Sequence, residues 1–113
     1  MRSLKALISK RTIHRAHVNT KEIMYLVHCG NLLDEQKLVD LGFPTVISNY
    51  GDILFVLTKA EIHDYVKNDS IGYFDIYASK RPVTKDWIIS NVKIFYMMDL
   101  LKMGFEIALL NEI

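Results

Sequence analysis

The middle of the chain has the sequence pattern of a β-hairpin followed directly by the start of a helix. Two runs of β-branched and large apolar residues, 45–48 and 53–57, flank the Asn-Tyr-Gly-Asp turn at 49–52. Asn, Gly and Asp tolerate the backbone angles of tight turns, so this segment predicts a hairpin. The Thr-Lys-Ala-Glu sequence at 58–61 has the capping-box pattern, in which the hydroxyl and the carboxylate each accept a hydrogen bond from a free backbone N–H. We therefore expect a helix over 59–67.

Two further helices are expected before the hairpin. Residues 21–29 follow Thr20, a good N-cap, and carry apolar residues at helical spacing until Gly30, a common C-terminal stop. Residues 31–41 repeat this pattern with Asn31 as the N-cap, and the Gly-Phe-Pro sequence that follows ends the segment. The two helices would form a helical hairpin.

The last part of the chain predicts two strands around a long helix. Residues 71–77 are aromatic and β-branched, which is typical of a strand, and Gly72 within them indicates a bulge or close packing. From Thr84 to Gly104 the apolar residues form a broad helical stripe, typical of a heavily buried helix. Residues 105–110 predict a final strand.

Together these elements predict an α+β fold: a small single domain with a short antiparallel sheet of three to four strands and helices packed on one face. A chain of 113 residues can bury one core without disulfide or metal staples. We assign residues 1–19 to a basic N-terminal arm that can form a short helix, and residues 20–113 to the domain. The expected core residues are Leu26, Val39, Leu54, Val56, Trp87, Ile88, Val92, Phe95 and Leu100.

Charge is divided unevenly along the chain. All six cations of the first 21 residues precede the first acid, Glu22, whereas eight cations and 13 acids follow from Glu22 onward. Such asymmetry indicates an acidic partner. The alternative is a solvated helix, or a strap on the domain's own acidic residues Asp34, Glu35 and Asp40. The candidate binding residues in the arm are Lys10, Arg11, His14, Arg15 and His17.

A second candidate contact surface lies on the strand expected at 71–77. Side chains alternate between the faces of a strand, so Tyr73, Asp75 and Tyr77 would share one face. Exposed tyrosines there would form a binding surface. Cross-strand packing is the competing and more common role for tyrosine in a strand.

No motif in the chain names a reaction. Phosphate loops and dinucleotide-binding fingerprints are absent. A small enzyme using His28, Cys29, His63 or Asp64 is the alternative hypothesis, although adjacent residues on a helix point about 100° apart, so His63 and Asp64 cannot pair with each other. The single cysteine lacks the second ligand pair of a structural zinc site, and we expect neither a metal nor a cofactor.

We therefore expect a non-enzymatic binding module whose basic arm engages an acidic protein surface or a second copy of the chain. Nucleic acid ranks below protein as a partner because the net charge is only +1. A small enzyme and a structural or assembly subunit are the alternatives. No apolar run reaches the roughly 20 residues of a membrane span, so we expect no membrane partner. One unpaired cysteine fits a reducing, cytoplasmic location.

Overall fold

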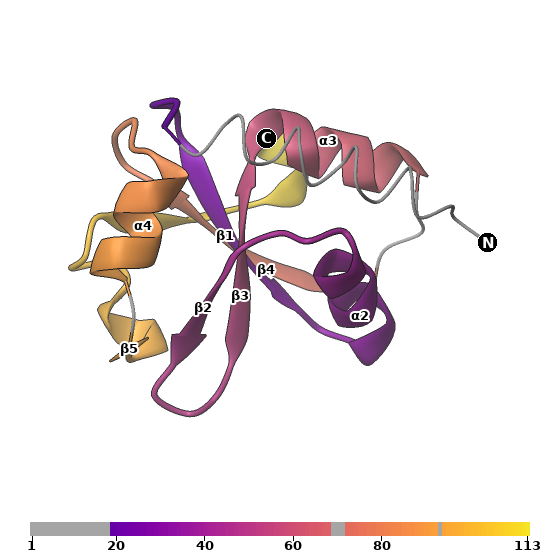
Figure 1. The fold of residues 1–113 in the computed structure, drawn as a ribbon, viewed down its shortest axis with the longest axis horizontal. Coiled ribbons are helices and arrows are strands. Elements are labelled where there is room, and N and C mark those ends of the chain that lie inside the picture. The colour runs from indigo at the N-terminus through magenta and orange to yellow at the C-terminus, as the bar shows by residue number, and fades with distance from the viewer. Residues whose placement is uncertain (1–18, 69–71, 93) are drawn as a thin grey trace.

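A computed structural model describes residues 19–68, 72–92 and 94–113, and a six-stranded sheet forms its centre (Figure 1). The strand order is β5-β2-β3-β1-β4-β6, and neighbouring strands are antiparallel except for β2 and β5, which pair in parallel. The strands are β1 (Met24–Cys29), β2 (Thr45–Ser48), β3 (Ile53–Thr58), β4 (Phe74–Ser79), β5 (Ile94–Phe95) and β6 (Phe105–Ala108). The helices are α2 (Leu32–Asp40), α3 (Lys59–Asn68) and α4 (Lys85–Asn91), with 3₁₀ turns at Met97–Asp99 and Leu110–Glu112.

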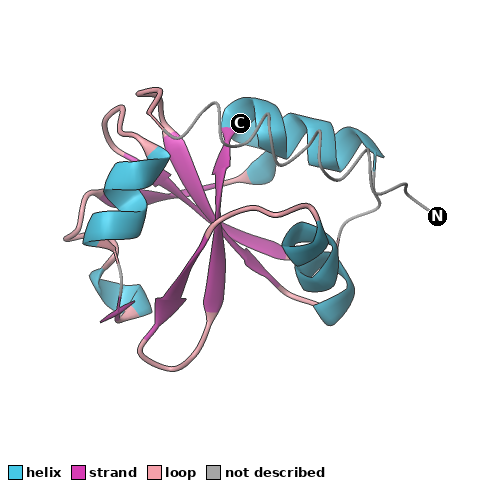
Figure 2. Cartoon of the chain, in the orientation of Figure 1, coloured by secondary structure: helices cyan, strands magenta, loops and turns pink. Residues whose placement is uncertain are grey.

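Helices cover both faces of this sheet (Figure 2). Helix α2 connects the parallel strands β1 and β2, and α3 connects the parallel strands β3 and β4, since parallel strands need a crossover. Leu38 of α2 and Ile62 of α3 belong to one apolar cluster on the sheet, whereas Ile88 of α4 belongs to the other. The sheet therefore separates two cores.

The α+β single domain predicted from the sequence is confirmed, with two differences in detail. The sheet has six strands, of which five form an antiparallel arrangement, so it is larger than the three to four expected. The helices lie on both faces of the sheet because the central strands are apolar on both sides. Within the described ranges, none of the helices combines the length and apolar character needed to cross a membrane.

The prediction of a helix over 21–29 is wrong, because residues 24–29 form the central strand β1. Leu26 faces the cluster under α4, and Val27 faces the cluster under α2 and α3. A strand that is buried on both faces has a continuous apolar run and loses the alternation that distinguishes strands from helices. No helical hairpin therefore forms with α2.

The hairpin and the two helix starts around it are confirmed. β2 and β3 pair with Val46 opposite Leu54, and Gly51 adopts a φ of 84° in the turn. Asn31 caps α2 by accepting a hydrogen bond from the N–H of Asp34 at 2.8 Å. At α3, Thr58 Oγ1 accepts from the Glu61 N–H at 3.2 Å, and Glu61 Oε1 accepts from the Thr58 N–H at 2.8 Å.

The long helix predicted from Thr84 is much shorter. It begins as predicted, with Thr84 Oγ1 accepting from the Trp87 N–H at 2.9 Å, but α4 ends at Asn91. The chain then adds β5 and a 3₁₀ turn before Gly104, whose φ of 98° sets the approach to β6. The apolar stripe marks burial correctly, since Phe95 and Leu100 are buried. Apolar residues can follow helical spacing without being helical.

The two later strands and most of the predicted core residues are confirmed, and β6 (Phe105–Ala108) is the strand expected at 105–110. The strand expected at 71–77 is β4, and it begins at Phe74 and ends at Ser79. Val39 is 46% exposed, so its assignment to the core is wrong, because it lies on the solvent side of α2. Trp87 is half-buried against the cluster under α4. The other predicted core residues, all confirmed as buried, are Leu26, Leu54, Val56, Ile88, Val92, Phe95 and Leu100.

Candidate functional site

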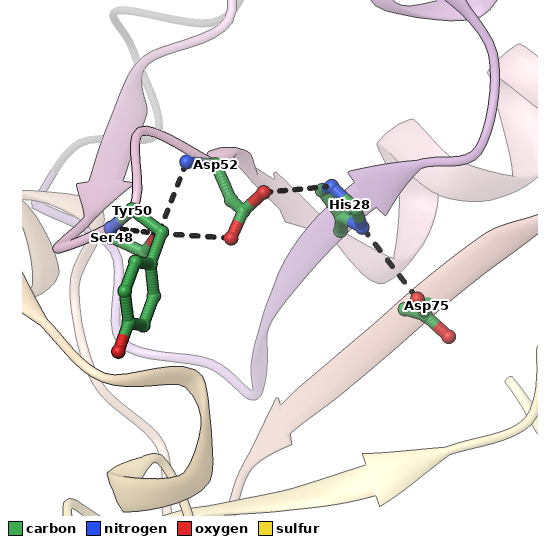
Figure 3. A network of polar contacts seen from close by, with 5 residues as sticks. All are labelled: His28, Ser48, Tyr50, Asp52 and Asp75. Atoms are coloured by element: carbon green, nitrogen blue, oxygen red, sulfur yellow. Dashed lines mark hydrogen bonds and ion pairs between the residues drawn. The ribbon is translucent and has the colours of Figure 1, made fainter.

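Histidine 28 lies between two carboxylates at one end of the sheet (Figure 3). His28 of β1 and Asp75 of β4 are cross-strand partners, and Nδ1 of the imidazole lies 3.5 Å from Asp75 Oδ2. On the other side of the ring, Nε2 lies 3.8 Å from Asp52 Oδ1. The His28 side chain is 29% exposed and each carboxylate 41% exposed. The cluster is therefore a polar patch open to solvent.

Ser48 positions Asp52 within this cluster (Figure 3). The Ser48 hydroxyl donates to Asp52 Oδ2 at 3.1 Å and accepts from the N–H groups of Tyr50 at 3.2 Å and Asp52 at 3.0 Å. Because its proton is directed at a carboxylate rather than at the imidazole, Ser48 is not activated as a nucleophile by His28. The hydroxyl instead holds the turn between β2 and β3.

The same residues do not form a metal centre. The two carboxylates lie against opposite nitrogens of the ring, so the three groups do not converge on one point. In the part of the chain that the structure describes, no three His, Cys, Asp or Glu side chains are grouped to hold a metal ion.

The predicted tyrosine face surrounds Asp75. Tyr73 is 69% exposed, while Tyr77 packs against the apolar cluster under α4. A hydrogen bond with the Asp75 carboxylate, together with its charge, raises the pKa of Tyr73. Burial raises the pKa of Tyr77, and the negative charge of Asp75 adds to that effect. Tyr73 is thus available for contact, whereas Tyr77 also supports the core.

The four residues of the enzyme hypothesis are not brought together. Cys29 is buried on the opposite side of β1 from His28, and burial and the nearby charges of Asp34 and Glu35 raise its pKa to about 12. His63 is exposed on α3, where its Nε2 lies 2.9 Å from the backbone oxygen of Ile113.

The last of these four residues, Asp64, accepts a hydrogen bond from the Asn68 side chain. The Cys29 thiol, with a pKa near 12, is a poor nucleophile.

Two ionisable groups, Asp34 and Lys85, are buried, and each is paired with other residues of the domain. Asp34 accepts hydrogen bonds from the Tyr65 hydroxyl at 2.6 Å, the Gly72 N–H at 2.9 Å and the Asn31 side chain at 3.0 Å. Burial alone would raise the pKa of Asp34, but these hydrogen bonds lower it. Asp34 is 2% exposed, so it is not available to a strap formed by the arm.

The second buried group is Lys85, the first residue of α4. Its side chain is fully buried, and Nζ lies 2.5 Å from Glu61 Oε1 and 5.7 Å from the centroid of the Phe43 ring. Burial lowers the pKa of Lys85 against the opposing effect of Glu61. The ion pair joins the first turns of α3 and α4, which lie on opposite faces of the sheet.

A small pocket of about 100 Å³ lies where the β4–α4 loop meets the start of β6. Its lining contains two cations, Lys80 and Arg81, and two aromatic residues, Trp87 and Phe105, together with Ser79, Val83, Met103 and Gly104. The Arg81 guanidinium lies over the Trp87 ring at 5.3 Å from its centroid, within the range of a cation–π contact.

This pocket lies close to the root of the basic arm. The backbones of Glu22 and Val83 exchange hydrogen bonds of 3.0 and 2.9 Å, which bring the start of the described chain beside the β4–α4 loop. The candidate residues Lys10, Arg11, His14, Arg15 and His17 themselves lie outside the described residues.

Comparisons with protein-family models, with curated proteins and with solved structures found no match to this chain.

Sequence reasoning missed both the His28 cluster and the Arg81–Trp87 pocket. If residues 24–29 are taken as a strand, His28 can face Asp75 on a neighbouring strand, and such a cross-strand pair would have indicated the His28 cluster. The second had a weaker indication, since Lys80 and Arg81 are adjacent cations next to Pro82, but the packing of Trp87 beside them is a tertiary contact.

Proposed function

We propose that this protein is a small binding module whose basic N-terminal arm engages an acidic partner. Among acidic partners, we favour a protein surface. Charge separation is the observation that carries this proposal. Residues 1–18 contain five cations and no acid, whereas the described residues contain eight cations and 12 acids. A basic segment attached to an acidic body attracts anionic surfaces at long range and speeds their association.

The position of the arm's root supports the same proposal. Lys21 precedes Glu22, which is bridged to Val83, and Lys80 and Arg81 lie just before Val83 in the same loop. Two cations of the domain, Lys80 and Arg81, are therefore in the loop that pairs with the chain just after the arm. Among the described residues, no ion pair involves Lys80 or Arg81.

We propose the face at β4 that carries Tyr73 and Tyr77 as a second contact surface, separate from the arm. Asp75 lies beside Tyr73, so an acidic partner would be repelled there. Tyr73 and Tyr77 therefore fit an apolar or basic region of a partner rather than an acidic one. The free thiol of Cys29 agrees with the intracellular location that we propose.

The test uses labelled polyglutamate and random-sequence duplex DNA as probes, with fluorescence anisotropy measured over a salt series. The variant Lys10→Ala/Arg11→Ala should bind polyglutamate about tenfold more weakly than the wild type at low salt, with a smaller dependence on salt. The matched control is Lys59→Ala/Lys67→Ala, which removes the same charge from exposed positions of α3 and should leave the affinity within about twofold.

Equal binding by the arm variant and the wild type would overturn the proposal. Stronger binding of duplex DNA than of polyglutamate at physiological salt would overturn the preference for a protein partner. Tyr73→Ala should leave polyglutamate binding unchanged, since that tyrosine lies beside the Asp75 carboxylate.

A further inference from the structure

We infer that the Arg81–Trp87 pocket receives an acidic side chain of the protein partner, with Arg81 as its main contact. This inference rests on the proposed function and adds to it the place on the domain where the partner is held. Such a pocket needs a lining that favours anions, a cation held in position and a volume that admits one side chain.

The lining of the pocket has the opposite charge to the rest of the domain. Lys80 and Arg81 contribute two cations, and no carboxylate lines the pocket. The neighbouring acids, Asp86 and Glu106 in sequence and Glu22 beside Val83, are not among the lining residues. In a described body that has more acids than cations, this is a local positive site. An acidic group is the ligand that such a lining favours.

The contact with Trp87 holds the Arg81 side chain in place. The guanidinium carbon lies over the ring at 5.3 Å from its centroid, and among the described residues no hydrogen bond or ion pair occupies the N–H donors of Arg81, which can therefore form two parallel hydrogen bonds to a carboxylate. Because this contact restricts the exposed Arg81 side chain, less conformational entropy is lost when an anion binds. Arg and Trp are also residue types that dominate the binding energy of protein interfaces.

The volume of the pocket indicates a side chain as the occupant. About 100 Å³ is well below the roughly 300–1,000 Å³ of pockets that enclose small-molecule ligands. Apolar walls from Val83, Met103 and Phe105 fit the methylene groups of a glutamate, while its carboxylate reaches Arg81. Gly104 lies in the wall, and a side chain there would be strained by the φ of 98°.

Trp87 is the only tryptophan of the chain, so its fluorescence reports directly on this pocket. The probe is a labelled hexaglutamate peptide, with Trp87 emission and anisotropy of the label followed in the same titration. Arg81→Ala should weaken binding about tenfold and abolish the change in emission, and Arg81→Lys should restore only part of both, because lysine keeps the charge but loses the paired hydrogen bonds. Lys67→Ala is the exposed control that removes the same charge on α3.

The variant Lys10→Ala/Arg11→Ala separates this inference from the proposed function. It should weaken binding while leaving the emission change at saturation intact. Binding that depends on the arm but leaves Trp87 emission flat, or an Arg81→Ala variant equal to Lys67→Ala, would overturn the pocket and leave the proposed function standing. Loss of all hexaglutamate binding in the wild type would overturn both. An equal Trp87 response to duplex DNA would overturn the protein side chain as the occupant.

Discussion

At the scale of single residues, Asp34 ties the first helix to the sheet and to α3. Its carboxylate accepts from Tyr65 on α3, from Asn31 at the cap of α2 and from the backbone of Gly72 before β4. A buried carboxylate with several donors stays ionised and holds those donors in place. A side chain at Gly72 would displace the capping Asn31, because a Cβ atom at that position would lie 2.0 Å from the Asn31 amide nitrogen.

Tyr65→Phe should lower the free energy of unfolding at pH 7 by about 1.5–3 kcal/mol, because it removes one hydrogen bond to a buried charge. The pKa of Asp34 is lowered in the folded state, so its contribution is present above the unfolded value of about 3.8 and is lost as the pH falls below it. The difference between variant and wild type should therefore shrink at pH 3. Urea unfolding at both pH values measures it.

Tyr50→Phe is the control, since Tyr50 is 80% exposed and should unfold like the wild type. A Tyr65→Phe variant that is equally destabilised at pH 3 and pH 7 would contradict the charged hydrogen bond.

Cys29 should react slowly with thiol reagents in the native protein. Burial raises the pKa of the Cys29 thiol to about 12, well above the ordinary value for cysteine, so the thiolate fraction at pH 8 should fall by at least about 100-fold. Labelling with iodoacetamide, native and in urea, measures this difference. Rapid native labelling would show that the thiol is accessible and would revive the enzyme hypothesis.

At the scale of elements, local chemistry predicted those segments whose ends are capped by their own residues. The caps of α2, α3 and α4 depend on partners three residues apart, at Asn31, Thr58 and Thr84, so each start was visible in the sequence. β1 depends instead on residues far along the chain, because β3 and β4 pair with its two edges and the two apolar clusters cover its two faces. The end of α4 likewise depends on the pairing of β5 with β2.

Phe95→Ala should cost about 3–5 kcal/mol, because Phe95 is 4% exposed and its loss leaves a cavity in the cluster under α4. The residue lies in a two-residue strand rather than in a helix, so the penalty arises from packing. Val39→Ala is the matched control and should be neutral or slightly stabilising, since this exposed valine of α2 is replaced by a better helix former. Chemical denaturation compares the two, and similar midpoints for both variants would contradict the packing account.

At the scale of the whole molecule, the sequence was sufficient for the division into a basic arm and an acidic body, but not for the sites on that body. Charge counts need no structure. The Arg81–Trp87 contact and the His28–Asp75 pair each need three-dimensional placement, the first between the β4–α4 loop and the first turn of α4 and the second across two strands. These two sites have opposite charge, so the domain has one place suited to an acidic partner and one suited to a different contact.

Chemical-shift mapping of the ¹⁵N-labelled protein during titration with hexaglutamate tests the account most directly, because it locates the contact without a substitution. We predict that the perturbed signals are those of the cationic arm, residues 80–84 and the Trp87 indole N–H, while His28, Asp52 and Tyr73 stay unchanged. Perturbations centred on the His28 cluster, or none at saturating peptide, would contradict the claim that the basic arm and the pocket at its root form the binding surface.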